Sequence, residues 1–501
     1  MNRENDKILE EFKNHVRKME LLGGTMALLD WDSRVYMPAK GVERRGDALG
    51  YLAGEFHKMS TSEKVKEFVE AFEEEKDLDE VTSAMLRGVK KQYERSLKIP
   101  AQFEEEYSIL CTKSSAAWRK AKASRDFEVF RPYLEKIAHM KFQCLDFLGC
   151  DENKYDTLLD DFEGGMTVEK LDVLFGELKE GIVDLLDRIK NSGVEINDDI
   201  LKVHVPKETQ VKLCNFILEN MGFDFEAGRM DETEHPFTTS FCNKDVRITN
   251  HYYENDFTNA LFSAIHEGGH AIYEQDIPDS LEHTGVNSAA SLGIHESQSR
   301  FYENIIGRSY EFWTYFYKEI QNEIPEFKNV DLDDFYKVIN KVKPSLIRTT
   351  SDELTYSLHV IIRYEIEKDL IAGKIKVKDL PEIWNAKYKE YLGVEPKNNS
   401  EGVLQDTHWA DGTIGYFPSY ALGNLYGAQF LNKMLQDIPD VYHKVSKGDL
   451  APVHQWLKEN VHKYAAIYTP AELIKKVTGE ELTAKYFLNY LNEKYSKIYN
   501  L

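Results

Sequence analysis

The chain has 501 residues, of which 42% are hydrophobic and 30% are charged, and its formal net charge is −23. This length allows a large buried core, and so acidic a protein is not expected to have nucleic acid or an anionic membrane as its main partner. The first residues contain no apolar segment of the secretory type, no apolar run reaches the length of a membrane span, and the five scattered cysteines form no CxxC pair, so we expect a cytoplasmic protein with reduced thiols.

The first half of the chain has helical periodicity. In residues 8–22, apolar side chains recur every three or four positions, and Gly23-Gly24 is expected to end this helix. Trp31 then falls in a stretch without periodicity, which predicts a connection. The further helices expected in this half are 44–59, 62–74, 81–97, 102–124, 127–147, 168–189 and 207–221, with polar or loop-like connections at 151–160 and 193–205.

The sequence predicts one pair of strands. Residues 237–242 and 245–249 are rich in β-branched and aromatic side chains, and Asn243-Lys244 between them suits a two-residue hairpin turn. The pair directly precedes a helix expected at 261–275. The helices expected after it are 289–306, 332–342, 353–371, 380–391, 417–435, 451–461, 470–478 and 484–495. We therefore predict one mainly α domain over residues 1–501, with lobes of about 1–225 and 226–501 around a cleft.

The helix expected at 261–275 contains the motif His266-Glu267-Gly268-Gly269-His270. Residues four apart lie on one helix face, one turn above the other, so both histidines can point at one metal ion with the glutamate beside it. Two neutral nitrogen ligands and a carboxylate near a water molecule are what a hydrolytic zinc site requires. For the motif alone, the alternative is a solvated helix face that carries two histidines.

A catalytic zinc site needs three protein ligands and one open position. Glu296, which follows His270 by 26 residues (296 − 270), is the best candidate for the third ligand. A helix, a loop and a returning helix of that length allow two helices to lie side by side. The alternative is that Glu296 only forms an exposed pair with Arg300 one turn later.

Small residues on both helices favour a close approach between them. Gly268 and Gly269 lie inside the motif helix, and each glycine inside a helix costs about 1 kcal/mol relative to alanine. Ala289, Gly293 and Ser297 are expected to form a small-residue ridge on the second helix. We predict that these residues bring Glu296 within reach of the metal.

Such a site supports peptide hydrolysis. A metal ion acidifies water and polarises a carbonyl, while Glu267 accepts the proton of the water and later delivers it to the leaving amine. The tetrahedral oxyanion needs a donor, for which His408, Tyr416 and Tyr420 are candidates; core packing is the alternative for the tyrosines. Zinc is the default ion for two histidines and a glutamate, and cobalt or manganese would fit the same ligands.

Six short motifs follow one another between residues 235 and 409: His235-Pro236-Phe237, Asp245–Thr249, His266–His270, His295–Gln298, Ile347–Asp352 and Gly402–Trp409. Together they resemble the motifs of the Taq-type thermostable metallocarboxypeptidases of bacteria and archaea. The resemblance implies a mostly helical, neurolysin-like fold with a deep cleft. It also implies an enzyme, usually a homodimer, that removes single residues from the C-termini of peptides.

The resemblance assigns roles to these residues. It implies that His266, His270 and Glu296 bind the metal, with Glu267 as general base and acid. Arg348, with Arg247 as a second candidate, would hold the terminal carboxylate of the substrate, because a guanidinium meets a carboxylate with two parallel hydrogen bonds. For each arginine the alternative is a structural ion pair.

Further roles are implied around the reacting carbonyl. In the related neurolysin-type oligopeptidases a histidine and a tyrosine twelve positions later serve the oxyanion, and His408 and Tyr420 have that separation (420 − 408 = 12). Tyr416 is expected to contact the substrate. The residues expected to orient the metal ligands from outside are His235, His295, Gln405 and Asp406.

The sequence therefore predicts a cytoplasmic metallocarboxypeptidase that acts on short peptides. An oligoendopeptidase on the same scaffold is the alternative within the class, and it lacks a positive group for a free C-terminus. A catalytically silent peptide-binding protein is the alternative from another class, against which the intact Glu267 argues. Peptides with a free C-terminus and a second copy of the chain are the expected partners.

Overall fold

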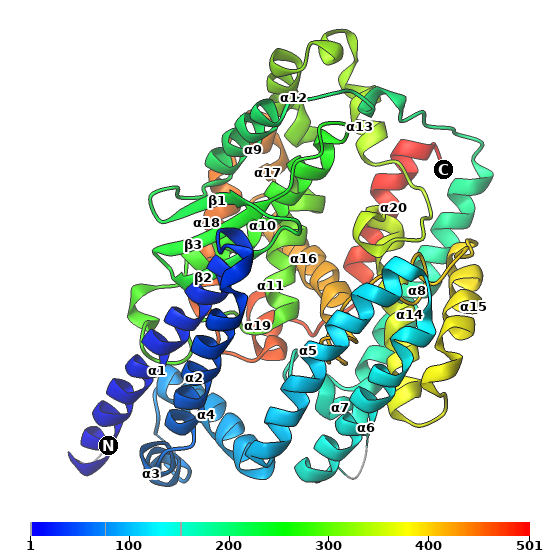
Figure 1. Ribbon diagram of the computed structural model, residues 1–501. Coiled ribbons are helices and arrows are strands. Elements are labelled where there is room, and N and C mark those ends of the chain that lie inside the picture. The colour runs from blue at the N-terminus through cyan, green and yellow to red at the C-terminus, as the bar shows by residue number, and fades with distance from the viewer. Residues whose placement is uncertain (1–2, 76, 151–152) are drawn as a thin grey trace.

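Helices form most of the chain in the computed structural model, which describes residues 3–75, 77–150 and 153–501 (Figure 1). The helices before the sheet are α1 (Arg3–Val35), α2 (Val42–Ser60), α3 (Glu63–Phe72), α4 (Glu80–Lys98), α5 (Ala101–Ser124), α6 (Arg131–Leu148), α7 (Lys154–Leu159), α8 (Val168–Asn191) and α9 (Lys207–Met221). Those after it are α10 (Phe257–Gln275), α11 (Leu292–Arg300), α12 (Tyr310–Glu323), α13 (Leu332–Ile339), α14 (Glu353–Ile371), α15 (Leu380–Leu392), α16 (Phe417–Asp437), α17 (Val441–Val445), α18 (Ala451–Asn460), α19 (Pro470–Thr478) and α20 (Lys485–Tyr499). The predicted mainly α fold is confirmed. Among the described helices, none has both the length and the apolar character that crossing a membrane requires.

The first helix differs from the prediction. It does not end at Gly23-Gly24 but continues to Val35, so Trp31 lies inside a helix and is buried, and the predicted connection there is wrong. The helix packs against the sheet at this point: a Cβ on Gly24 would stand 3.6 Å from the carbonyl oxygen of Phe241, an ordinary contact distance. Packing along α1 thus outweighs the roughly 1 kcal/mol that a glycine costs inside a helix.

Three of the described α-helices were not predicted: α7, α12 and the short α17. α7 lies in the connection expected at 151–160, of which residues 151 and 152 are outside the described residues. α12 has a clear signal in the sequence, because its buried residues follow helical spacing. They are Phe312, Trp313, Phe316, Tyr317 and Ile320.

The sheet contains the predicted hairpin and one more strand. β2 (Thr238–Cys242) pairs antiparallel with β3 (Asp245–Asn250), and β1 (Gly228–Glu232) pairs parallel with β3 on its other side. β1 has little β-propensity in its sequence, so its pairing depends on the tertiary fold. Val246 and Ile248 of β3 are fully buried, and the sheet packs against α10.

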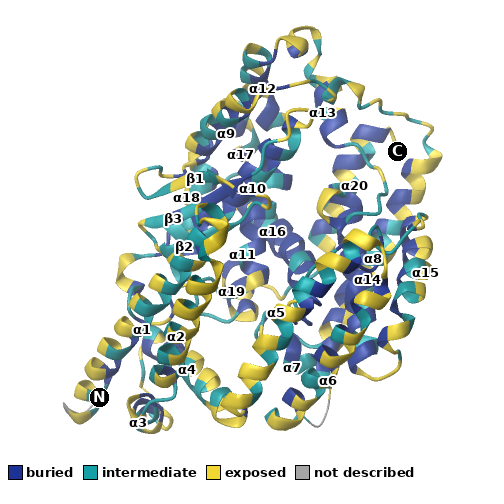
Figure 2. Cartoon of the chain, viewed as in Figure 1, coloured by how far each residue is buried: buried dark blue, intermediate teal, exposed yellow. Residues whose placement is uncertain are grey.

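The described residues form two hydrophobic core clusters. The main cluster contains residues from α5 through α20, among them residues of α10, α14 and α16. A smaller cluster joins Phe12 of α1 and Phe68 of α3 to Ile277 and Leu281, which follow α10. In Figure 2 the helices α10, α14 and α16 are mostly buried, whereas α1, α2 and α5 are exposed along much of their length. Side chains on α10, α14 and α16 are therefore attached to a tightly packed part of the backbone.

Candidate metal centre and catalytic cleft

The predicted metal ligands lie on α10 and α11, which pack against each other. α10 begins at Phe257, earlier than predicted, where the side chain of Asp256 caps it. The helix predicted at 289–306 begins only at Leu292, and from Phe301 to Ile306 it is a π-helix. π-helical turns widen a helix locally and are frequent at functional sites.

Glycines allow α11 to lie close to both of its neighbours. A Cβ on Gly269 of α10 would stand 2.6 Å from the carbonyl oxygen of Gln298 and 2.7 Å from the Cα of Ser299. A Cβ on Gly423 of α16 would stand 2.6 Å from the Cγ of Glu296. Any other residue at these two positions would therefore push α11 away from its neighbours.

The other small residues predicted at this contact face elsewhere. Gly268 faces α9, Gly293 faces the carboxylate of Glu163, and Ala289 precedes the helix altogether. The predicted ridge of Ala289, Gly293 and Ser297 is therefore not the contact between α10 and α11. The close approach itself is present, and the second glycine of the motif makes it.

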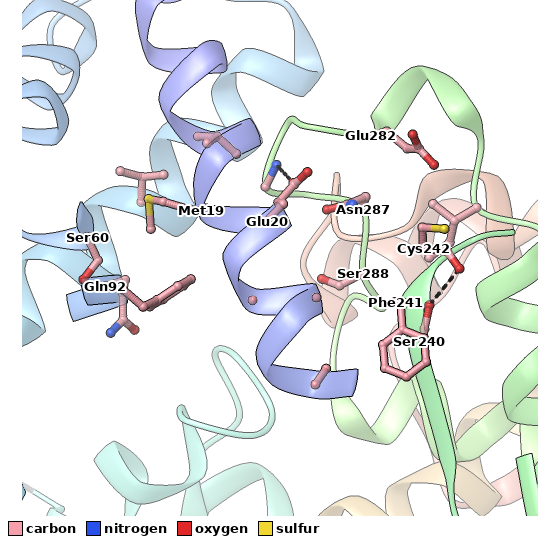
Figure 3. A pocket seen from close by; sticks show the side chains of 18 of the residues that line it. Met19, Glu20, Ser60, Gln92, Ser240, Phe241, Cys242, Glu282, Asn287 and Ser288 are labelled. Carbon is pink, nitrogen blue, oxygen red and sulfur yellow. Dashed lines mark hydrogen bonds between the residues drawn. The ribbon is translucent and has the colours of Figure 1, made fainter. Parts of the chain in front are cut away.

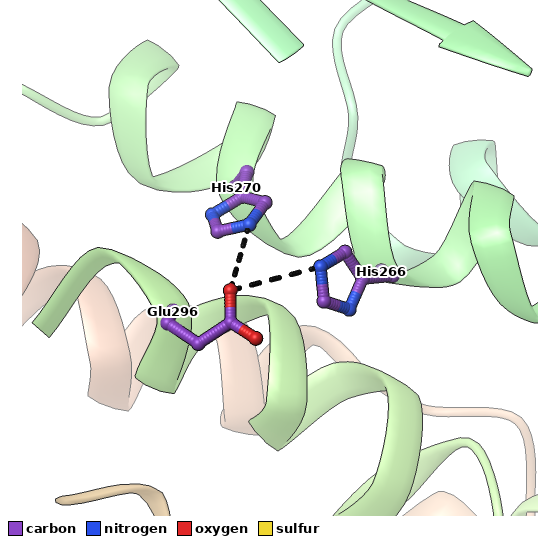
Figure 4. Close-up of side chains that lie close together, drawn as sticks. All are labelled: His266, His270 and Glu296. Atoms are coloured by element: carbon purple, nitrogen blue, oxygen red, sulfur yellow. Dashed lines mark ion pairs between the residues drawn. The ribbon is translucent and has the colours of Figure 1, made fainter. Parts of the chain in front are cut away.

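His266, His270 and Glu296 converge on one point (Figure 4). The Oε2 atom of Glu296 lies 3.8 Å from Nε2 of His266 and 3.5 Å from Nε2 of His270. One ligand atom from each residue lies within 4.8 Å of the others. Atoms about 2.1 Å from one ion at tetrahedral angles would lie roughly 3.4 Å apart. The three atoms are thus spaced nearly as ligands of one metal ion.

Both histidines are held through Nδ1. The Nδ1–H of His266 donates to Glu303 at 2.9 Å. Nδ1 of His270 contacts Nδ1 of His295, whose Nε2–H donates to Glu274 at 2.8 Å. A carboxylate can only accept, so Nδ1 of His295 is left to accept from His270, and the Nε2 atoms of the neutral His266 and His270 rings carry no proton. An unprotonated nitrogen is the form that binds a metal.

Burial and neighbouring charges set the protonation of the ligands. Burial lowers the pKa of His270 to about 3. Burial acts on His266 in the same direction, but two nearby carboxylates outweigh it and raise its pKa, so this ring loses its proton at a higher pH than His270. Burial alone would raise the pKa of Glu296, but the guanidinium of Arg300 and the two histidines hold it well below its usual range.

The expected pair between Glu296 and Arg300 exists, at 2.7 Å, but it is largely buried: the side chains are 8% and 14% exposed. It engages Oε1 of the glutamate, while Oε2 faces the two histidines. Glu296 can therefore pair with Arg300 through one carboxylate oxygen and bind a metal ion through the other. Two imidazole nitrogens and one ionised carboxylate are a donor set that fits a divalent metal ion.

Glu267 borders a cavity of about 760 Å³ together with the three ligand candidates. Its Oε2 accepts a hydrogen bond from the hydroxyl of Thr238 on β2 at 2.6 Å. Burial raises the pKa of Glu267. A carboxylate next to the metal centre with a raised pKa suits a group that first accepts a proton and then returns it.

Arg348 borders the same cavity and is held by several neighbours. Its Nε and Nη2 donate to one oxygen of Asp406 at 3.2 and 2.9 Å, and its Nη1 donates to the hydroxyl of Tyr356 at 3.0 Å. Gln405 accepts from its backbone N–H at 3.0 Å, and Arg363 donates to the other oxygen of Asp406 at 2.7 Å. These contacts use three of its five side-chain N–H groups, so one N–H remains on each Nη for a further carboxylate. Gln405 and Asp406 thus contact Arg348 and not the metal ligands.

Arg247 and His235 do not border this cavity. Arg247 forms a two-pronged pair with Asp245 at 2.8 and 2.9 Å, and its guanidinium lies 4.5 Å from the ring centroid of Trp31. His235 is exposed, and its carbonyl oxygen accepts a hydrogen bond from Thr233. The fold therefore does not bring these two residues to the metal ligands.

The oxyanion candidates lie beside Arg348. Tyr416 and Tyr420 border the cavity, and the hydroxyl of Tyr420 lies 3.0 Å from Nε2 of His408. Burial lowers the pKa of His408 to about 4, so its ring is neutral at pH 7. The guanidinium of Arg348 lies 4.7 Å from the ring centroid of Tyr420. In the tautomer that carries its proton on Nε2, His408 donates to this hydroxyl, whose own proton is then free to form a hydrogen bond into the cavity.

Sequence reasoning missed Thr238, Glu274, Glu303 and Tyr356, which all contact residues of the site. Two of them have a signal in the sequence, because Glu274 follows His270 by four residues (274 − 270) and Glu303 follows Glu296 by seven (303 − 296), both helical spacings. Thr238 and Tyr356 lie on other elements, and no local pattern indicates them.

Comparisons of the sequence and of the structure with known proteins agree on one family. Residues 11–495 match the model of the carboxypeptidase Taq (M32) metallopeptidase family. Carboxypeptidase 1 of Bacillus subtilis is 46% identical over 494 residues, which cover 98% of this chain and 99% of that protein. The crystal structure of an M32 carboxypeptidase from Deinococcus radiodurans has a TM-score of 0.95 at 35% identity and covers 99% of this chain and 100% of its own. A Pyrococcus furiosus carboxypeptidase structure has a TM-score of 0.95 at 36% identity, with 99% of each chain covered.

Proposed function

Because the chain belongs to the carboxypeptidase Taq (M32) metallopeptidase family and is a metal-dependent carboxypeptidase, we propose that it cuts peptides at the centre formed by His266, His270 and Glu296. The observation that carries this proposal is the convergence of one ligand atom from each residue within 4.8 Å. A divalent metal held there would polarise the scissile carbonyl and acidify water. We propose zinc as that ion, with cobalt and manganese as alternatives for the same ligands.

Glu267 is proposed as the general base and acid. Its carboxylate takes a proton from the attacking water and later gives that proton to the nitrogen of the leaving amino acid. The hydrogen bond from Thr238 at 2.6 Å holds the carboxylate in place between these two transfers. Tyr420, held by His408, is proposed to donate a hydrogen bond from its hydroxyl to the developing oxyanion.

Arg348 is proposed to bind the C-terminal carboxylate of the substrate. Its two remaining N–H groups lie on Nη1 and Nη2, an arrangement that can form two parallel hydrogen bonds with a carboxylate. Tyr416 borders the same cavity and is proposed to contact the substrate. Arg247 is a weaker candidate for the carboxylate, because it is paired with Asp245 and does not border the cavity.

We further propose a homodimer that acts on short peptides in the cytoplasm. The support is the family resemblance and the five free cysteines, which suit a reducing compartment. The proposed organisation is a single catalytic domain, with a helical lobe to about residue 225 and a catalytic lobe from about residue 226. Size-exclusion chromatography with light scattering tests the dimer directly.

A defined peptide, incubated with and without a chelator and followed by mass spectrometry, tests the function. We expect loss of one residue at a time from the C-terminus, abolished by the chelator. Amidation of the C-terminus is expected to slow cleavage strongly in the wild type but not in Arg348→Ala, whereas the exposed control Arg119→Ala keeps the discrimination. Internal cuts would indicate an oligoendopeptidase, and no cleavage with metal bound would indicate a silent peptide-binding protein.

A further inference from the structure

Three cavities lie in a row from Arg348 toward α1 and share lining residues. The catalytic cavity of about 760 Å³ shares Leu292 and His295 with a second cavity of about 460 Å³. The second shares Glu274 and Ser288 with a third cavity of about 560 Å³. Arg348 borders the first of these and neither of the others. A peptide whose C-terminus lies at Arg348 therefore has a path for its upstream residues past His295 toward α1.

The third cavity, here called the distal cavity, lies between α1, β2 and the connection that follows α10 (Figure 3). Its apolar side chains include Phe12, Val16, Met19, Phe56, Val65 and Phe241. Glu20, Glu274 and Glu282 border it as well, whereas no lysine or arginine of the described chain does. Apolar walls combined with carboxylates and no cation suit a ligand with an apolar stem and a positive end.

Two of the three carboxylates already have partners. Glu20 accepts hydrogen bonds from Nδ1 of His283 at 2.9 Å and from the backbone N–H of Gly285 at 3.0 Å. Glu274 accepts from His295, the histidine that supports the metal centre, at 2.8 Å. These two carboxylates add negative charge around the distal cavity but are committed to the fold.

The third carboxylate, that of Glu282, is available to meet a cation. Within the described part of the chain it has no hydrogen bond and no ion pair, and it is half-buried at the cavity. Lys244 is near enough for an electrostatic interaction, but its ammonium group pairs with Asp279 at 2.6 Å. A positively charged ligand therefore has one carboxylate to bind without displacing an existing contact.

The edge strand β2 relates the distal cavity to the bond that is cut. Thr238 of this strand contacts Glu267, whereas Ser240 and Asn243, two and five residues further on, border the distal cavity. An extended chain rises about 3.3 Å per residue, which places the cavity roughly 7–17 Å along the strand from Thr238. A substrate of similar extension reaches it with a residue about three to five positions before the scissile bond.

We propose that the distal cavity is a specificity subsite for a lysine or arginine side chain about three to five residues upstream of the scissile bond. The methylene groups of such a side chain pack on the apolar wall, and its charged end meets Glu282 with the field of Glu20 and Glu274 behind it. The proposal rests on the proposed function, because it takes the substrate C-terminus to lie at Arg348.

Peptides that are N-acetylated and differ only by lysine, alanine or glutamate at positions three, four and five upstream test this subsite. We expect the wild type to cleave the best lysine peptide about threefold to tenfold more efficiently than its glutamate counterpart, mainly through KM. Salt should weaken this preference. In Glu282→Lys the preference should disappear or reverse, whereas Glu169→Lys, the same charge change at an exposed position of α8, should keep it.

Equal cleavage of all peptides by the wild type would overturn the subsite, as would a lysine preference that survives Glu282→Lys. A preference that appears only with a free N-terminus would also overturn it, because the ligand would then be the terminal ammonium group. The discrimination between free and amidated C-termini is measured in the same variants. If the wild type cleaves free and amidated peptides equally well, the role of Arg348 is contradicted. If only the lysine preference is absent, the distal subsite is wrong and the role of Arg348 is unaffected.

Discussion

Glu303 accepts a hydrogen bond from Nδ1 of His266 at 2.9 Å, and this contact turns Nε2 of the histidine toward Glu296. Both glutamates lie on the continuous segment formed by α11 and the π-helix that follows. Arg300, between them in sequence, donates to Glu296 at 2.7 Å and to Glu303 at 3.2 Å. One helical segment therefore supplies a metal ligand, the group that orients a second ligand, and the cation that stabilises both carboxylates.

Removal of the Glu303 carboxylate is expected to weaken metal binding. In Glu303→Ala the ring of His266 loses its acceptor, and loss of such an orienting partner typically costs about 10–100-fold in metal affinity. Competition with a chelator at buffered free zinc measures this, with the exposed Glu326→Ala as control. Unchanged affinity in Glu303→Ala would show that the contact does not orient the ligand.

A methyl group at Gly269 is expected to separate α10 and α11. Its Cβ would stand 2.6 Å from a backbone oxygen of α11, so Gly269→Ala should lose about 1–3 kcal/mol of stability and part of its bound metal. A methyl group on Gly50 in α2 would meet no described atom within 4 Å, so Gly50→Ala should be neutral or gain up to about 1 kcal/mol. Thermal unfolding and metal content measure both effects. Equal behaviour of the two variants would contradict the close packing.

Loss of the Tyr420 hydroxyl is expected to slow the chemical step. Removal of one oxyanion donor typically lowers kcat by about 10²–10³-fold. Tyr420→Phe should therefore lose kcat with little change in KM and with full metal content. Tyr486→Phe, at a partly exposed tyrosine whose hydroxyl bonds Glu480 away from the catalytic cavity, is the matched control. A normal kcat in Tyr420→Phe would assign this tyrosine to packing.

Glu367 is expected to make stability depend on pH. It is fully buried and accepts hydrogen bonds from Trp409 and Tyr155, both at 2.7 Å, and burial raises its pKa from 4.5 to about 7. Between these values the folded protein keeps a proton that the unfolded chain loses. Its contribution is therefore present below pH 4.5 and lost as the pH rises to 7, by up to about 3 kcal/mol.

The variant Glu367→Gln lacks this titration. Its thermal unfolding midpoint should rise relative to that of the wild type between pH 5 and pH 8. Other titrating groups are common to both proteins and cancel in the difference. A difference that stays constant over this range would contradict the raised pKa.

Much of the helical fold was predictable, because apolar residues at helical spacing encode which face of each helix is buried. The exceptions depend on distant contacts. α1 continues through Gly23-Gly24 because it packs along the sheet and α2, and β1 exists because β3 offers it a free edge. The sheet is far in sequence from α1, and β3 is separated from β1 by a loop and by the strand β2.

The sequence by itself determined the metal-binding motif, because His266 and His270 are four residues apart and the geometry of one helix turns them to one side. Only the tertiary structure decided how that motif is supported. Glu274 and Glu303 stand at helical spacing from the ligands in the sequence, but their hydrogen bonds to His295 and His266 form only between packed segments, and Thr238 reaches Glu267 from β2. The side chain of Arg348 is held by Asp406 and Tyr356, which lie on other elements. Helical periodicity is a local property of the chain, whereas hydrogen bonds between distant elements exist only after the core has packed.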